Sequence, residues 1–226
     1  MFAHNYTGIL FLLTNCFNTM MIDDITIMKN QFLELLRTTE REGISNLISE
    51  LEELGFFEAP ASSRFHLCKR GGLVEHSLNV YTNAIDIREM LIKRDETLED
   101  LLPIDSVILS TLLHDVCKAD IYRPTMKKKK NNYGVWTDVP GYDVDYDNFP
   151  LGHGEKSVII LLRSGLDLTD DEILAIRWHM NVWDLPFQSA DIKGNFNAAK
   201  RICPLLTLLQ TADSIASNIF ESDSPE

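Results

Sequence analysis

The sequence has few cysteines and no long apolar run. Its four cysteines, Cys16, Cys68, Cys117 and Cys203, lie far apart and form no Cys-x-x-Cys pair. This spacing fits reduced thiols in a cytoplasm better than a disulfide framework. The longest apolar run, residues 8–17, is about half the length that spans a bilayer, and no Lys or Arg precedes it. We therefore expect a cytoplasmic protein with no transmembrane helix, no signal peptide and no membrane partner.

Basic residues are also scarce. The chain has 21 Lys and Arg against 34 Asp and Glu, which gives a formal net charge of -13. Such a chain repels long duplex nucleic acid, so we do not expect a long nucleic acid as its partner. A small anionic substrate is compatible with this charge if metal ions supply the positive field. The 226 residues are 45% hydrophobic and 24% charged, which excludes a disordered chain and indicates one globular domain, with or without a small appended segment.

What the sequence does have is helical periodicity. Apolar residues recur at intervals of three and four along most of the chain, which is typical of amphipathic helices. We predict helices over residues 24–37, 44–54, 72–92, 104–118, 153–164, 169–181 and 205–219. The fourth of these is apolar on most sides, as in a helix buried in the middle of a bundle. Thr169 and Glu172 form a capping box, and Gly165 is placed to end the preceding helix. The sequence therefore predicts an all-α fold.

One region breaks the helical pattern. Residues 135–139 and 142–146 alternate about the turn dipeptide Pro140-Gly141, which predicts a small β-hairpin. Because it lies between helices that carry histidines, the hairpin is a candidate lid. The dense basic run Lys127–Lys130 has two interpretations: it could clamp the phosphates of a nucleotide, or it could pair across the hairpin with the alternating Asp of residues 143–147. We favour the pairing.

The chain divides into four stretches. Residues 1–21 lack helical or strand periodicity, and we expect them to form a leader, with an alternative start at Met20, Met21 or Met28. Residues 22–60 are expected to form an N-terminal helical segment. Residues 61–220 are expected to form the main domain, and residues 221–226 a polar tail.

The histidines and carboxylates have unusual positions. The pair His114-Asp115 ends the most apolar helix, where a charged carboxylate is costly to bury unless it is paired or bound to a metal. Four more candidates lie near helix ends or on close-packed faces, namely His76, His153, His179 and Asp213. Mixed imidazole and carboxylate ligands suit Mn, Fe, Zn or a similar ion, and an Asp can bridge two ions through its two oxygens.

These residues carry a family resemblance. The order His76, His114-Asp115 and Asp213, within Gly-Gly-Leu-Val-Glu-His-Ser, Leu-Leu-His-Asp-Val-Cys-Lys and Leu-Gln-Thr-Ala-Asp-Ser-Ile-Ala, resembles the HD superfamily of metal-dependent phosphohydrolases. The resemblance spans roughly residues 64–220 and implies an HD-domain helical bundle over the main domain. His153 and His179 match two further histidines that two-metal members carry. The signature of the HD-GYP phosphodiesterases is absent, because Trp precedes His179 and no Gly-Tyr-Pro follows.

The resemblance implies a centre of one or two divalent transition metal ions, Mn, Fe, Zn, Ni or Co, with Mg as a further option. One ion would bind His76, His114, Asp115 and Asp213. A second ion would share Asp115 and bind His153 and His179. In a one-metal enzyme the last two histidines would instead bind a phosphate or act as general acid.

Three residues are candidates for catalysis or substrate contact. Asp115 would hold the ions that activate water. Lys118 lies one turn after His114 and would place its ammonium on a phosphate oxygen, although a Lys in the last turn of a helix is also expected from the helix dipole. His66 precedes the first ligand helix and is a weaker candidate for substrate contact, the alternative being a polar residue of a connector.

The expected function is hydrolysis of a phosphate ester of a nucleotide or a similar small molecule by a phosphatase or phosphodiesterase. Two alternatives stay open: a 3'-5' exonuclease on single-stranded nucleic acid, and a non-catalytic HD-fold signalling or binding module. The net charge of -13 and the lack of a recognisable nucleic-acid-binding domain in residues 1–60 argue against the exonuclease. The intact ligand set argues against the binding module. The sequence carries no mark of an oligomeric state.

Overall fold

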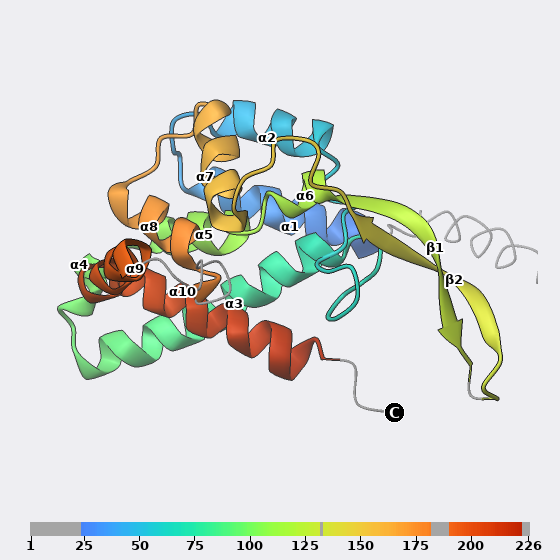
Figure 1. Cartoon of the computed structure of the whole chain (residues 1–226). Helices are drawn as coiled ribbons and strands as arrows, with labels where there is room; N and C mark the ends of the chain where they lie inside the picture. Colours follow the sequence, from blue (N-terminus) through green and yellow to red (C-terminus); the bar gives the residue numbers. More distant parts are fainter. Residues whose placement is uncertain (1–23, 132, 182–189, 223–226) are drawn as a thin grey trace, which may run out of the picture.

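The structure, a computed structural model, describes residues 24–131, 133–181 and 190–222 (Figure 1). This part of the chain is mostly helical, with one small antiparallel sheet of two strands. Its elements are α1 (Asp24–Thr38), α2 (Ile44–Glu53), α3 (Gly72–Arg94), α4 (Leu98–Leu101), α5 (Ile104–Leu113), α6 (Lys118–Ile121), β1 (Tyr122–Lys130), β2 (Trp136–Val144), α7 (His153–Arg163), α8 (Asp170–Trp178), α9 (Ala190–Ile202), α10 (Pro204–Ile215) and the π-helical turn η2 (Ala216–Phe220). The expected leader lies outside the described residues, as does the end of the expected polar tail. None of the helices in the described ranges is both long enough and apolar enough to cross a membrane.

The central helix of the bundle is α5, as its apolar sequence predicts. It contacts α1, α3, α8 and α10, and every residue from Ser106 to Leu113 is buried. In Figure 1, α2 lies above α5 and α10 lies below it. The helix ends at Leu113 and not at Lys118, because backbone hydrogen bonds from Val116 to Leu113 and from Lys118 to Asp115, at 3.2 and 2.9 Å, tighten the chain into turns. The His114-Asp115 pair therefore lies in a tight turn at the end of the core helix.

The first two helices share the core of the bundle. Their apolar faces contribute Phe32, Leu36 and Leu47 to a buried cluster that also holds residues of α3, α5 and α7. The turn between α1 and α2 is tied to α8, since Arg41 donates to both carboxylate oxygens of Glu172 at 2.8 Å. Glu172 also forms the capping box with Thr169 that the sequence predicts.

Besides the four-residue helices α4 and α6, one longer helix, α9, is not predicted by the periodicity. Only Phe196 and Ala199 of its 13 residues are buried, with Ile192 packed beside them, so its apolar stripe is narrow. Its Gly and two Asn also have low helix propensity. The two buried side chains pack into a second apolar cluster with residues of α3, α8 and α10. Tertiary packing, more than local sequence, therefore makes this segment helical.

The predicted hairpin is present, but its turn lies elsewhere. Strand β1 pairs with β2 so that Met126 faces Pro140. The dipeptide Pro140-Gly141 lies inside β2, and the turn lies between Lys130 and Trp136, where the Asn131 side chain accepts two backbone hydrogen bonds at 3.0 Å. A proline fits inside β2 because both edges of a two-stranded ribbon are open. The alternation seen in the sequence lies mainly in β2, and the four lysines lie at the end of β1.

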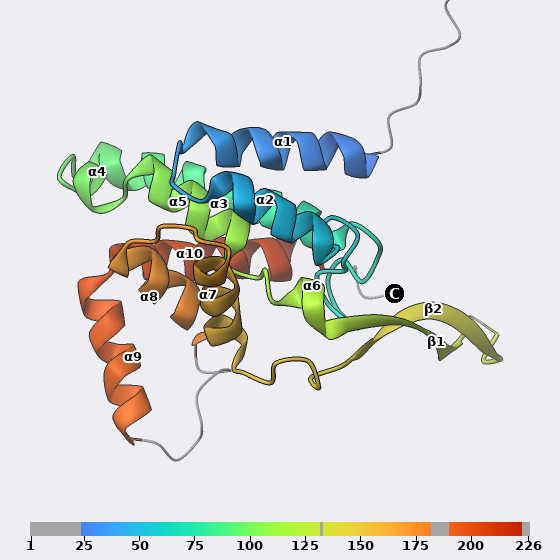
Figure 2. The same ribbon diagram turned by 90° about the horizontal axis from the view of Figure 1, so that it is seen from above.

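Cross-strand ion pairs account for part of the basic run. Lys127 Nζ lies 3.1 Å from Asp143, and Lys128 Nζ lies 3.1 Å from Asp138. These contacts support the pairing interpretation over the phosphate clamp. Figures 1 and 2 show the far end of the hairpin directed away from the helices. In this structure the hairpin does not lie over the bundle as a lid.

Candidate metal centre

The predicted ligands come together around Asp115. His76 lies in the first turns of α3, His153 is the first residue of α7, His179 directly follows α8, and Asp213 lies on α10. His153 and Asp213 are half-buried, and the other ligands, His114 included, are buried. Five separate elements of the fold therefore converge on the carboxylate that follows α5.

The two oxygens of Asp115 face different imidazoles. Oδ2 lies 3.5 Å from His76 Nε2 and 3.3 Å from His114 Nε2. Oδ1 lies 2.5 Å from His153 Nε2 and 3.3 Å from His179 Nε2. His76 Nε2 also lies 3.4 Å from Asp213 Oδ1. The carboxylate therefore divides the imidazoles into two sets, one at each oxygen.

Most of these separations are longer than hydrogen bonds. An N–H to O hydrogen bond spans about 2.7 to 3.2 Å, whereas two ligand atoms of one tetrahedral ion, each about 2.0 to 2.2 Å from it, lie about 3.3 to 3.5 Å apart. The contacts of His76, His114 and His179 with the carboxylates, at 3.3 to 3.5 Å, match the second range. His153 differs, because its 2.5 Å contact with Asp115 is a hydrogen bond. These buried His and Asp groups can therefore hold a metal ion.

The hydrogen bonds of the imidazoles point their other nitrogens at Asp115. His114 Nδ1 donates to the Thr111 carbonyl at 2.9 Å, and His179 Nδ1 donates to the Ile176 carbonyl at 2.7 Å. A carbonyl can only accept, so Nδ1 of each ring carries a proton and Nε2 is the nitrogen that faces Asp115. The Nε2 atoms of both rings are buried without a hydrogen-bond partner, as is that of His76. In a buried site, a nitrogen that faces a carboxylate is stabilised by a proton or a metal ion between the two atoms.

The central charges offset one another. Burial alone would raise the pKa of Asp115, but Lys118 and His114 outweigh it and hold that pKa well below its usual value. Burial alone would lower the pKa of Lys118, but its Nζ lies 2.6 Å from Asp115 Oδ2, and this contact raises the pKa. Near neutral pH, Asp115 is therefore ionised and Lys118 is charged.

The imidazoles differ in their affinity for protons. Burial alone would lower the pKa of His76, but the nearby carboxylates of Asp115 and Asp213 raise that pKa well above its usual value. Burial acts in the same way on His153, but Cys117 and Asp115 raise its pKa to about 10. For His179 burial prevails, and its pKa is lowered. A divalent ion would displace the protons of the first two rings, because metal ligands must be deprotonated.

A cavity of about 270 Å³ opens beside this cluster. Asp115, Lys118, His179 and Asp213 contribute to its walls. The rest of the lining is mainly polar, and it comprises His66, Met180, Asn181, Gln210, Ser214, Ser217 and Asn218. The ammonium of Lys118 and the ligand side chains therefore border the same space, which is large enough for a small anion.

His66, the weaker candidate for substrate contact, lies in the wall of this cavity. Its Nε2 is buried without a hydrogen-bond partner. Burial, with the nearby charges of Lys118 and His76, lowers the pKa of His66 to about 4, so the ring is neutral at pH 7. The structure therefore brings all the predicted site residues to one place.

One residue of the site is not predicted from the sequence. Glu221 falls in the expected polar tail, yet it is 7% exposed and lies 2.9 Å from Nδ1 of His76. No motif or apolar period marks it, because only the path of the chain after α10 brings it to the cluster.

Comparison of the chain with protein-family models, curated proteins and solved structures finds no match. The motifs of the sequence and the geometry of the centre therefore carry the functional interpretation.

Proposed function

We propose that this chain is a metal-dependent phosphohydrolase of the HD type, which hydrolyses a phosphate ester of a nucleotide or a similar small molecule. One observation carries the proposal. The Nε2 atoms of His76, His114 and His179 are buried without partners and face the carboxylate of Asp115 at 3.3 to 3.5 Å. The order of these residues along the chain and their local motifs add the resemblance to the superfamily.

The donor set fits one or two divalent ions. His76, His114, Asp115 and Asp213 would hold one ion, and Asp115 with His153 and His179 would hold a second. Imidazole with carboxylate suits Mn, Fe, Zn, Ni or Co, and Mg stays an option. When bound, such ions act as Lewis acids and lower the pKa of water towards neutrality.

The chain's own residues would orient the ester. Lys118 lies 2.6 Å from Asp115 and borders the cavity, which supports a role for its ammonium in binding a phosphate oxygen. Gln210 and Asn181 border the same cavity and offer amide groups to the rest of the substrate. His66, which is neutral at pH 7, can donate or accept one hydrogen bond there.

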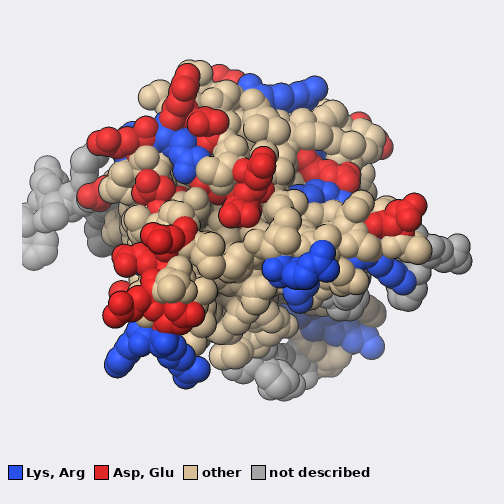
Figure 3. Space-filling model, turned by 90° about the vertical axis from the view of Figure 1, so that its left-hand side faces the viewer, with Lys and Arg blue, Asp and Glu red and all other residues tan. Residues whose placement is uncertain are grey.

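Size and charge favour a small substrate over a long nucleic acid. The cavity measures about 270 Å³, and the chain carries a net charge of -13. On the face drawn in Figure 3, Asp and Glu gather towards one side while Lys and Arg are scattered, so this face offers no continuous basic track. Backbone binding of a polyanion depends on such a track.

The test is turnover by the Mn-loaded chain beside Asp115→Asn and the control Asp138→Asn. Asp138 is an exposed hairpin residue paired with Lys128, so its change should leave activity intact. The substrates are mononucleotides, nucleoside triphosphates, cyclic dinucleotides and short oligonucleotides. We expect metal-dependent release of phosphate or nucleotide that only Asp115→Asn abolishes. Turnover of oligonucleotides alone would favour the exonuclease, and no turnover at full metal occupancy would favour the binding module.

A further inference from the structure

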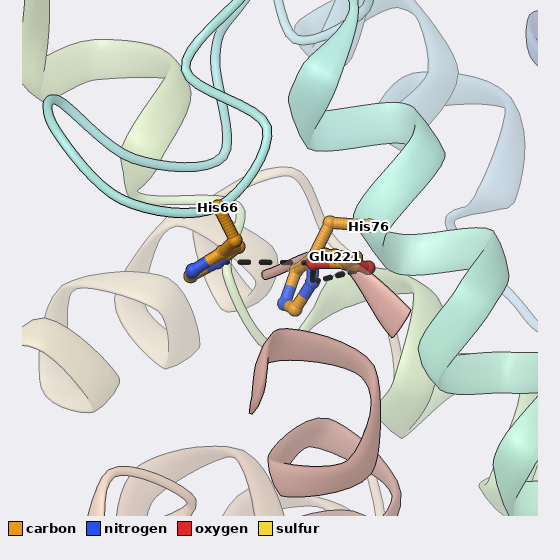
Figure 4. A group of neighbouring side chains, drawn as sticks. All are labelled: His66, His76 and Glu221. Carbon is orange, nitrogen blue, oxygen red and sulfur yellow. Dashed lines mark hydrogen bonds and ion pairs between the residues drawn. The ribbon is translucent and has the colours of Figure 1, made fainter. Parts of the chain in front are cut away.

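The carboxylate of Glu221 is buried against His76. Glu221 follows the π-helical turn η2, and its backbone N–H donates to the Ala216 carbonyl at 3.0 Å. Its oxygens lie 2.9 and 3.2 Å from His76 Nδ1, and Asn79 donates to one of them at 2.9 Å. Figure 4 shows the Glu221 carboxylate beside the His76 ring, with His66 on its other side. One element, α10 with η2, thus brings Asp213 to one nitrogen of His76 and Glu221 to the other.

The rings of His76, His114 and His179 are each oriented by a hydrogen bond from Nδ1, but the group that accepts this bond differs. His114 and His179 each donate from Nδ1 to the carbonyl three residues earlier, at a helix end where carbonyls are free. His76 lies in the first turns of α3, where the carbonyls are used by the helix itself. A third acceptor must therefore come from outside α3. Glu221 supplies it, and it is the one acceptor of the three that carries a charge.

His66, His76 and Glu221 also lie close enough together to form a metal site of their own. The geometry argues against that reading. His76 Nδ1 lies 2.9 and 3.2 Å from the two Glu221 oxygens, so a direct hydrogen bond from Nδ1 accounts for this contact without an ion. Binding through Nδ1 would also require both nitrogens of His76 to lose their protons, because Nε2 faces Asp115 and Asp213.

We propose that Glu221 is a positioning residue that keeps the proton of His76 on Nδ1 and so directs the Nε2 lone pair to the metal. The inference rests on the proposed metal centre. A charged acceptor makes an imidazole a stronger electron donor than a carbonyl does, so Glu221 strengthens the metal bond of His76. Partners of this kind typically change metal affinity by about 10-fold to 100-fold.

The test is calorimetric titration of the metal-free full chain with Zn²⁺, comparing wild type, Glu221→Gln, Glu221→Ala and the control Glu58→Gln. Glu58 is exposed, so its change should leave Zn²⁺ affinity at the wild-type value. We expect Glu221→Ala to bind Zn²⁺ about 10-fold to 100-fold more weakly. The glutamine keeps an acceptor without the charge, so we expect a smaller loss.

Wild-type affinity in Glu221→Gln overturns the inference and leaves the proposed function standing. No Zn²⁺ binding by wild type overturns both. Should the alanine variant unfold, the near-isosteric glutamine variant still decides the outcome. Long-range ¹⁵N spectra of the Zn-loaded chain provide a readout that a merely structural role would not move. They should show the proton of His76 on Nδ1 in wild type and a changed Nδ1 shift in Glu221→Gln.

Discussion

Lys118 Nζ lies 2.6 Å from Oδ2 of Asp115, the same oxygen that faces His76 and His114. The ammonium therefore stabilises the central carboxylate from the side that borders the cavity. The proposed function gives Lys118 a second role, towards an incoming phosphate, which can be separated by experiment from its contact with Asp115.

Replacing Lys118 with Met should lower turnover by about 100-fold while leaving bound metal unchanged, because the ammonium stabilises charge on the phosphate and is not itself a ligand. Metal content by mass spectrometry and turnover measured on the same preparation separate the two effects. Lys128→Met, on the exposed hairpin, is the control. Loss of metal from Lys118→Met would show that the lysine acts on the ligands instead.

The division of imidazoles between the two oxygens of Asp115 predicts different losses of metal. His76→Ala should remove the ion at Oδ2, whereas His179→Ala should remove only the ion at Oδ1. Metal per chain, counted beside the control Asp138→Ala, checks this. If His179→Ala keeps as much metal as the control, the site is mononuclear and His153 and His179 have another role.

Metal removal should make stability depend on pH. The pKa of His153 is raised from 6.5 to about 10, so its contribution to the free energy of unfolding is complete below pH 6.5 and is lost as the pH rises towards 10. The pKa of Asp115 is lowered below 3.8, so its contribution is present above pH 3.8 and is lost only in acid. The metal-free chain should therefore be most stable between pH 3.8 and pH 6.5.

A divalent ion bound at the proposed centre would replace the protons of His76 and His153, so it should prevent the loss of unfolding free energy at alkaline pH. We expect the difference in Tm between Mn-loaded and EDTA-treated chain to widen from about pH 5.5 to about pH 8.5. Thermal unfolding at several pH values measures it. If the difference in Tm stays constant over this pH range, the ion does not displace the protons of the histidines.

Gly154 should not tolerate a side chain. A Cβ at this position would lie 2.2 Å from the carbonyl oxygen of Arg177, so α7 and α8 would have to separate. We expect Gly154→Ala to cost about 1 to 3 kcal/mol in the free energy of unfolding, measured in urea. The matched control is Gly194→Ala in α9, where a Cβ meets nothing within 4 Å, and where alanine should stabilise by up to about 1 kcal/mol. If Gly154→Ala and Gly194→Ala are equally stable, α7 and α8 do not approach each other as closely as the structure shows.

Local sequence predicts the parts of this fold that local forces determine. The capping box of Thr169 and Glu172 and the buried face of α5 are present, because each follows from residues a few positions apart. The strand β1 and the helix α9 have weak local preferences and owe their form to pairing with β2 and to packing against the bundle. The ligands of the candidate site are predictable as a set, whereas Glu221 is not, because a π-helical turn and not a motif brings it to His76.

Two of the acidic partners of His76 come from the last helical element of the described chain, Asp213 on α10 and Glu221 just after η2. A ribosome releases the chain from its N-terminus, so α3, α5, α7 and α8 emerge before these carboxylates exist. A nascent chain that has reached residue 200 carries all the predicted imidazoles and Asp115, but neither Asp213 nor Glu221. The proposed centre would therefore bind metal tightly at His76 only after the last helix docks, which would couple metal loading to completion of the domain.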